Sequence, residues 1–426
     1  MNRDWHRLRA VVIESDDWGL CAWVPDDQAH RVLTGTPAFR SPPGRIYGRS
    51  TLERADDVRA IGSLLLEFRG GDGFPPVWQA NTVVANPDCE RMKPPLFEGA
   101  DIPVIACPDL PSRWARPGLD KAVDQGIEEG WWWPELHGLH HVPVASWLGA
   151  LRRGLNDARR AHEQQVFVCE AVEEAGEYDA ATPLEVRISD LERAADIFRK
   201  RFGRTATSLC PPDYRWDDAL DATAVKLGLT TFQGMAERTG RLHPRIARVL
   251  GALRWPEMRG PRFHMPPRIA FEPRGSESPE GPVGARAAHE AARAAWRAGR
   301  PAVVSTHRVN YAHLDPAWRE KGLAALRDLI GRLIGDSATF LTDAEARGLV
   351  ERAWSVRPIG RRGALVRFLG VPQEPVTWPL PAGLAGVVGA EVIEGRGAER
   401  ATVRVEDGQL IGSFDPGEYL VTWRRS

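Results

Sequence analysis

The sequence predicts an α/β protein in which a large part built on a parallel sheet is followed by a small antiparallel β domain. For about the first 350 residues, strand-like apolar runs alternate with helix-like runs, as in a parallel sheet with crossover helices. Beyond about Trp354 the runs become short and alternating, with Gly and Pro turns between them. We therefore expect one domain over residues 1–353 and another over residues 354–426. An apolar content of 43% in 426 residues is enough to fill a sizeable core.

The expected strands of the first domain are short apolar runs, several of which end in polar residues. The first is AVVI at residues 10–13, and we expect the N-terminal segment to enter it directly. The others are residues 77–81, 102–106, 206–209, 229–233, 301–305 and 337–341. In the second domain the expected strands are residues 364–368, 401–405 and 419–423.

The expected helices carry apolar residues at helical spacing. One face of residues 189–202, for example, carries Leu191, Ala194, Ala195, Phe198 and Phe202. The expected helices are residues 51–68, 146–162, 189–202, 285–298, 318–334 and one that begins at Asp343. Two segments rich in Gly and Pro, residues 34–50 and 272–281, are expected to be loops, and the second is the best candidate for a mobile segment.

Composition restricts the partners and the compartment. With 56 basic and 57 acidic residues the net charge is −1, which favours neither nucleic acid nor a membrane surface. We expect a small molecule or an oligosaccharide as the partner, and the sequence leaves the oligomeric state open. The five cysteines form no C-x-x-C pair, which argues against a disulfide framework or a cysteine zinc site. Because no apolar signal segment or membrane-length run is present, we expect a cytoplasmic protein.

Two adjacent carboxylates, Asp16 and Asp17, follow the strand at residues 10–13. A strand that ends in acidic residues brings them to the carboxyl edge of a sheet, where α/β folds place their active sites. Neighbouring carboxylates repel each other, so burying both costs stability unless a cation or a shared proton compensates. The alternative is a solvated acidic turn.

Imidazoles that suit the same cation occur later in the chain. His137 and His141 are four residues apart, a spacing that places two rings on one side of a turn. Pro134 and Pro143 flank them, so we expect a loop at a strand end rather than a regular helix. A surface or core-edge histidine cluster is the alternative for the pair alone. Together with the Asp pair, the histidines indicate a site for a divalent metal.

These motifs resemble those of the polysaccharide deacetylase (NodB-homology) superfamily, which has an Asp-Asp pair after its first strand and a later His-x-x-x-His element. The resemblance covers roughly residues 9–350. It implies a distorted (β/α) barrel of about seven strands and a metal-dependent hydrolase. It also implies that Asp17, His137 and His141 are the metal ligands and that Asp16 is the catalytic base. Zn²⁺ is the metal we expect, with Co²⁺, Ni²⁺ and Mn²⁺ as alternatives.

The same resemblance assigns His307, at the end of the expected strand 301–305, as a general acid. A hydrogen-bonded histidine at the core edge is the alternative. Two positions differ from the family pattern. Trp18 stands between the Asp pair and Gly19. The family's Arg-x-Pro-x motif resembles residues 210–214, where Cys210 replaces the Arg that braces the catalytic Asp, and Arg215 is a candidate replacement.

Further polar and aromatic residues are candidates for the pocket. Those expected to bind substrate are Trp18, Asn81, Tyr214 and Arg215. Other residues expected near the pocket are Glu135, His140, Asp213 and His264. The implied reaction removes acetyl or similar acyl groups from a carbohydrate or related amide. A glycoside hydrolase that pairs Asp16 with Asp213 or Glu135 is one alternative. A catalytically silent sugar-binding protein is the other.

Overall fold

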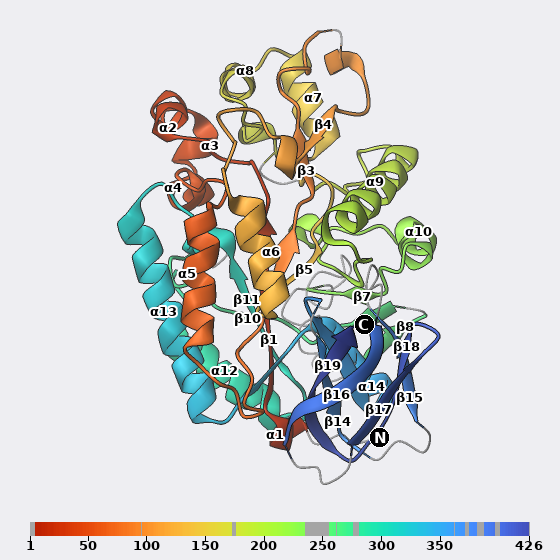
Figure 1. Ribbon diagram of the computed structural model, residues 1–426. Coiled ribbons are helices and arrows are strands. Elements are labelled where there is room, and N and C mark those ends of the chain that lie inside the picture. Colours follow the sequence, from red (N-terminus) through yellow and green to blue (C-terminus); the bar gives the residue numbers. More distant parts are fainter. Residues whose placement is uncertain are drawn as a thin grey trace.

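The computed structural model describes residues 5–94, 96–172, 176–234, 255–260, 262–275, 281–361, 363–370, 375–380, 387–396 and 401–425. Figure 1 shows a large sheet with helices around it and, in blue, separate sheets formed by the C-terminal part of the chain. The expected α/β class, with an all-β portion at the C-terminal end, is confirmed.

The large sheet has ten strands in the order β10-β11-β1-β2-β5-β6-β7-β9-β8, and β12 also pairs with β1. Its strands are β1 Ala10–Trp18, β2 Trp78–Thr82, β5 Trp132–Leu136, β6 Ser208–Leu209, β7 Thr231–Phe232, β8 Glu257–Arg259, β9 Arg262–His264, β10 Ile269–Ala270, β11 Ala302–His307 and β12 Thr339–Leu341. All neighbours are parallel except β8 and β9. Among the described residues the pairing runs from β10 to β8 without closing. The sheet is therefore an open, curled half-barrel, which agrees in part with the expected distorted (β/α) barrel.

Helices cover the outside of this half-barrel (Figure 1). The longer ones are α5 Ala55–Leu66, α6 Leu119–Glu129, α9 Leu184–Phe202, α12 Ala285–Arg297, α13 Pro316–Gly335 and α14 Asp343–Arg352. The shorter ones are α1 Trp5–Leu8, α2 Asp27–Leu33, α3 Pro37–Arg40, α4 Pro42–Tyr47, α7 Val144–Arg152, α8 Asn156–Glu163 and α10 Asp221–Lys226. Single 3₁₀ turns are η1 Leu96–Glu98, η2 Cys107–Asp109, η3 Glu170–Val172, η4 Pro212–Tyr214, η5 Asp218–Leu220 and η6 Arg308–Asn310. Within the described part of the chain, no helix combines the length and apolar character that a membrane crossing requires.

The two faces of β1 have different partners. Val11 and Ile13 belong to a core formed with α5, α12 and α13. Val12 belongs to a separate cluster, and Glu14 and Asp16 follow it at two-residue steps. Because side chains alternate along a strand, these three residues share the other face. The strand thus packs Val11 and Ile13 against these helices, while its opposite face changes from apolar Val12 to acidic Glu14 and Asp16 toward the carboxyl end.

Several expectations about local structure are corrected. The chain reaches β1 through α1 and not directly, and residues 34–50 contain α3 and α4 rather than loop alone. The expected helix 146–162 is broken into α7 and α8, because Gly154 between them has a φ of +70°. The expected strand 102–106 is β4 Val104–Ala106, which pairs antiparallel with β3 Ala85–Pro87 outside the large sheet. Of the expected mobile loop, residues 276–280 lie outside the described residues.

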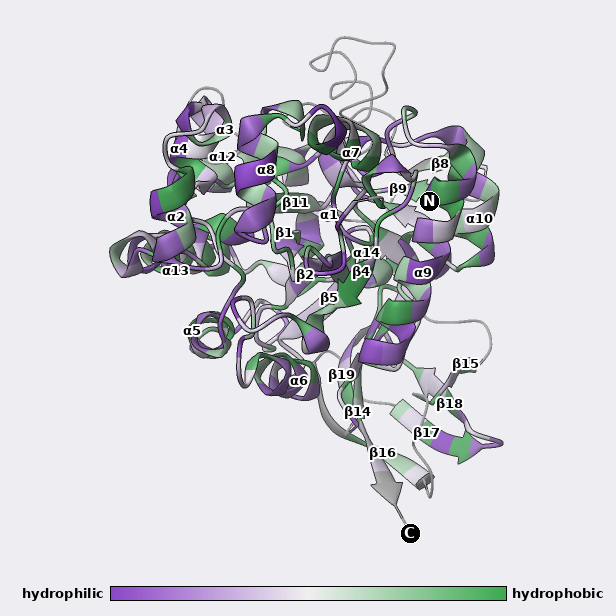
Figure 2. Ribbon diagram, turned by 90° about the horizontal axis from the view of Figure 1, so that it is seen from above, coloured by the Kyte–Doolittle hydropathy of each residue, from purple (hydrophilic) through white to green (hydrophobic). Residues whose placement is uncertain are grey.

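The C-terminal part forms two antiparallel sheets, in the orders β13-β14-β19-β16 and β15-β18-β17. Their strands are β13 Trp354–Ile359, β14 Gly363–Phe368, β15 Val376–Pro379, β16 Val387–Arg396, β17 Ala401–Glu406, β18 Gln409–Phe414 and β19 Gly417–Arg425. In Figure 2, β17 and β18 alternate between hydrophilic and hydrophobic residues. This alternation is typical of strands with one buried face, and the buried side chains include Val366, Phe368, Trp378 and Phe414.

Buried ion pairs join these sheets to the half-barrel. Arg367 of β14 is 1% exposed and contacts Glu345 of α14, and it also lies 2.5 Å from Asp72. Arg357 of β13 lies 3.2 Å from the same Glu345. We retain residues 1–353 and 354–426 as proposed domains, since α14 ends at Arg352 and the first antiparallel strand begins at Trp354.

Candidate metal centre and active site

Asp16 and Asp17 are adjacent, yet both line one cavity. In a regular strand, adjacent side chains point to opposite faces. Here Asp17 has a φ of +74°, and the pairing of β1 with β2 shifts register between Ser15 and Trp18. Such an irregularity re-aims a side chain at the end of a strand. The backbone of Asp17 therefore allows both carboxylates to face the same space.

A loop after β5 brings the two predicted histidines together. One carboxylate organises it, since Glu177 accepts the backbone N–H groups of Leu139, His140 and His141 at 2.9, 3.0 and 2.7 Å. Gly138 has a φ of +82°, and a Cβ there would lie 2.5 Å from the Glu177 carboxylate. The position therefore requires glycine. The expected loop at a strand end is confirmed.

Asp17, His137 and His141 form a compact set of donors. The Asp17 Oδ1 atom lies 3.5 Å from His137 Nε2 and 3.8 Å from His141 Nε2. Two ligands of a tetrahedral ion, each bonded at about 2.1 Å, are about 3.4 Å apart. His137 Nδ1 lies 2.7 Å from the carbonyl oxygen of Cys210. Since only a protonated Nδ1 donates to that oxygen, Nε2 is the ring nitrogen left to bind a cation beside Asp17. The three residues therefore fit a divalent cation.

A second group of donors shares His137. Its other members are Asp16 and Cys210, and the three donor atoms also lie within 4.8 Å of one another. Burial raises the pKa of the Cys210 thiol, which disfavours the thiolate that a metal needs. Asp16 is already hydrogen-bonded by protein groups. The set that contains Asp17 is therefore the better cation site among the described residues.

Asp16 is 2% exposed and is held by two side chains. Arg268 donates to both of its oxygens, at 2.5 and 3.1 Å, and Asn81 donates to Oδ1 at 2.5 Å. Burial alone would raise the pKa of Asp16, but the charge of Arg268, followed by those of His137 and His307, holds it far below its ordinary range. Asp16 is therefore an ionised carboxylate of fixed orientation.

His307 lies beside Asp16 because β11 pairs with β1 in the register that opposes these two residues. Its Nε2 lies 3.7 Å from Asp16 Oδ2, and its Nδ1 lies 2.7 Å from Glu272 Oε1. Glu272 also accepts a hydrogen bond from Asn310 at 2.7 Å. Since Nδ1 donates to Glu272, Nε2 is the nitrogen available to the cavity.

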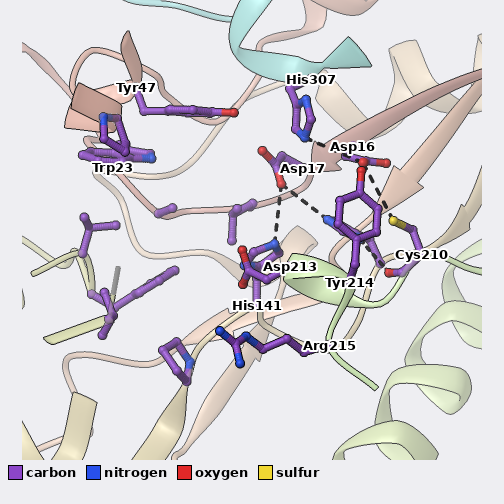
Figure 3. A pocket seen from close by; sticks show the side chains of 18 of the residues that line it. Asp16, Asp17, Trp23, Tyr47, His141, Cys210, Asp213, Tyr214, Arg215 and His307 are labelled. Atoms are coloured by element: carbon purple, nitrogen blue, oxygen red, sulfur yellow. Dashed lines mark hydrogen bonds and ion pairs between the residues drawn. The ribbon is translucent and has the colours of Figure 1, made fainter. Parts of the chain in front are cut away.

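The cavity that these residues share has a volume of about 350 Å³. Figure 3 shows Asp17 near its centre, with Asp16, Cys210 and Tyr214 on one side and Trp23 and Tyr47 on the other. The predicted residues that line it are Asp16, Asp17, His137, His141, Tyr214, Arg215 and His307, together with Asp213.

Trp18 and Asn81 do not line this cavity, which corrects their expected role in binding substrate there. Trp18 is 1% exposed in the apolar core, where its ring lies 4.7 Å from that of Trp132, and its indole N–H donates to Ser15. Asn81 is fully buried and donates hydrogen bonds to Asp16 and Gln233 instead. Both residues lie at or next to the carboxyl end of a strand beside the site, a position from which the sequence predicts contact with substrate.

The arginine that braces Asp16 is not the expected Arg215. Arg215 lies 3.3 Å from Asp179 and does not brace Asp16. Arg268, directly before the two-residue strand β10, braces Asp16 instead. It also donates to the Tyr214 hydroxyl at 2.8 Å. Sequence reasoning missed Arg268, and the available signal was an Arg beside a very short apolar pair in Pro-Pro-Arg-Ile-Ala.

Three other expected pocket residues have structural positions. Glu135 accepts the backbone N–H groups of residues 207 and 208 at 3.0 Å each, which ties β5 to β6. His140 is fully buried, 3.5 Å from Asp190 and 3.6 Å from Glu177. His264 is buried in β9 and stacks on Phe232. None of the three lines the cavity.

No protein-family model and no curated protein matches this chain. Several solved structures are similar at a distance, including the following three. The catalytic domain of peptidoglycan N-acetylglucosamine deacetylase from Eubacterium rectale is 9% identical over 78% of this chain and 88% of its own, with a TM-score of 0.33. Agd3, a carbohydrate deacetylase, is 10% identical over 98% of this chain and 65% of its own, with a TM-score of 0.42. The 4-alpha-glucanotransferase from Thermococcus litoralis is 14% identical over 80% of this chain and 38% of its own, with a TM-score of 0.40. Similarity at this level assigns no function to this chain.

Proposed function

We propose that this protein is a metal-dependent hydrolase that removes acetyl or similar acyl groups from a carbohydrate or related amide. One observation carries the proposal. The donors of Asp17, His137 and His141 converge at a cavity that Asp16 and His307 also line. A cation site, an ionised carboxylate and an imidazole in one cavity are the groups that amide hydrolysis needs.

Asp17, His137 and His141 would hold the ion, for which Zn²⁺ is the first candidate and Co²⁺, Ni²⁺ and Mn²⁺ are alternatives. Such an ion supplies Lewis acidity toward the amide carbonyl and lowers the pKa of a bound water. The hydrogen bond between His137 and the Cys210 carbonyl orients the ring for this role.

Asp16 is the proposed base. It is ionised, and Arg268 and Asn81 fix the direction in which its oxygens point. In this position it accepts the proton that the attacking water loses as its oxygen bonds to the carbonyl carbon.

His307 is the proposed acid. Glu272 accepts from its Nδ1, so Nε2 faces the cavity and carries the proton that the leaving amine requires. The carbon–nitrogen bond breaks as the amine nitrogen takes this proton. The products are a carboxylic acid and a free amine.

Two other functions are weighed against the same residues. Glycoside hydrolysis needs two carboxylates that flank the bond. Glu135 is fully buried in its contacts to β6, whereas Asp213 lines the cavity with Asp16, so a pair of Asp16 and Asp213 keeps this alternative in view. The second alternative, a catalytically silent sugar-binding protein, rests on Cys210 in place of an arginine. Arg268 supplies the missing contact and weakens that suggestion.

Elemental analysis of the purified protein, combined with a screen for acetate released from acetylated oligosaccharides, tests the proposal. We expect about one divalent ion per chain and acetate release that a chelator abolishes. Shortened glycans without acetate would identify a glycoside hydrolase. Sugar binding without either product would identify a binding protein.

A further inference from the structure

The cavity has a second wall with a different chemistry from the metal site. Its side chains are Leu20, Ala22, Phe167, Val168 and Val172, and each is less than 9% exposed. They belong to one apolar cluster, and Trp23 packs against it. The wall therefore comes from the segments after β1 and around η3, whereas strand ends supply most of the polar side.

The aromatic part of this wall is held in place by its neighbours. The Trp23 ring stacks on Tyr47 with a centroid distance of 5.8 Å and an interplanar angle of 15°. Phe39 meets Trp23 edge-on at 5.2 Å. Figure 3 shows Trp23 and Tyr47 across the cavity from Asp16 and Tyr214. The wall is thus a preformed surface that faces the reacting groups.

Such a wall discriminates between parts of a substrate. The five aliphatic and phenyl side chains offer no hydrogen-bond partner, so a sugar hydroxyl placed against them gives up its water without compensation. A methylene group placed there gains instead, by roughly a factor of three to four in affinity for each one fully buried. The rim carries Asp213 and Arg215, which suit the hydroxyl groups of a sugar.

We propose that the acyl group this site prefers is longer than acetyl, with at least four carbons in an apolar chain that lies against Phe167, Val168 and Val172. The inference rests on the proposed function, since it assigns the acyl half of the amide to the apolar wall and the sugar amine to the polar rim. The base and the acid keep the roles described above, and the bond broken is the same amide bond.

Straight-chain hydroxamic acids test this inference by binding alone, because their two oxygens chelate a divalent ion and their chain lies where the acyl group would. Calorimetry on the metal-loaded protein should show affinity rising about threefold per methylene from two to six carbons. Val168→Thr and Val172→Thr keep the side-chain shape and add a hydroxyl. In both variants the affinity should depend less on chain length, and the affinity for acetohydroxamate, whose chain is too short to reach the wall, should stay unchanged. Val166→Thr is the matched control, because Val166 is fully buried in the same segment but does not line the cavity.

The outcomes separate this inference from the proposed function. A flat series on a protein that binds metal and releases acetate overturns the inference and leaves the function standing. Loss of glucosamine binding in Val168→Thr also overturns it, because the wall would then bind the sugar. If the protein holds no metal, the function fails. The inference, which rests on that function, then fails with it.

Discussion

Arg268 donates to both oxygens of Asp16 across 252 positions of sequence, at 2.5 and 3.1 Å. Its Nε atom contacts Glu14, two residues before Asp16 on the same face of β1. One guanidinium therefore spans two buried carboxylates. The planar guanidinium presents several donors in a fixed fork and can bond two carboxyl groups at once. A lysine ammonium group has no such fork.

Arg268→Lys should lower turnover while leaving the metal content unchanged. Lysine keeps the positive charge but bonds Asp16 through one point, so the base loses its fixed direction. We expect a loss of about 10- to 100-fold in kcat, with little change in KM. Steady-state kinetics and metal analysis of one preparation measure both. Arg201→Met, which removes contacts to the outer-helix residues Asp120 and Asp124 and to the Phe202 ring, all away from Asp16, is the control. A variant with native kcat would show that Arg268 does not position the base.

His137→Ala and His141→Ala should each lose the bound metal. Removing one of three ligands should weaken affinity by more than the roughly 100-fold that loss of an outer hydrogen bond costs. Elemental analysis after dialysis against a weak chelator measures the loss. His289→Ala serves as the control, because His289 pairs with Asp336 on the helical side of the molecule. Full metal content in both cavity variants would refute the assigned ligands.

Asp16→Asn and His307→Ala should retain the metal and lose activity. Each removes one proton-transfer group that is not among the proposed ligands, so turnover should fall by about 10²- to 10⁴-fold. Metal content and kcat are measured on the same samples. If Asp16→Asn loses its metal, then Asp16 is a ligand and the base is another residue.

Much of the large sheet could be predicted from sequence because its central strands are apolar runs long enough to show their period. The two-residue strands β6 and β7 lie within the expected strands 206–209 and 229–233, whereas β5, β8, β9 and β10 were not among the expected strands. The metal ligands were recognisable because Asp17, His137 and His141 occur in two short motifs. Arg268 and Glu272 were not, since each meets its partner only through the pairing of β10 and β11 with β1. The bulge at Asp17 and the burial of Trp18 likewise depend on tertiary packing.

Arg367→Met should destabilise the whole chain. The substitution leaves Asp72 buried without its cation and leaves Glu345 paired with Arg357 alone, and removal of one partner of a buried pair costs about 3–5 kcal/mol. Urea unfolding measures the change. Arg404→Met breaks an exposed pair with Glu406 and should cost about 0–1 kcal/mol. Equal stability of the two variants would contradict the role of the buried cluster.

His313→Asn should reduce the loss of stability at acid pH. Burial, followed by the charge of Arg49, lowers the pKa of His313 from 6.5 to about 4. The unfolded chain takes up a proton below about pH 6.5. The folded chain does so only near pH 4, so native stability falls as pH drops through this window. The variant lacks that contribution, and its melting temperature should vary less between these limits. An unchanged pH slope would contradict the assignment.

Position 17 must satisfy two separate requirements, a left-handed backbone and a metal-binding side chain. Only Gly, Asn and Asp adopt this conformation at low cost, and other residues lose about 1–2 kcal/mol there before any chemistry is considered. A mutational scan scored by protein abundance should therefore mark position 17 as intolerant without testing catalysis. Asn is the informative substitution, because it keeps the backbone and changes only the ligand.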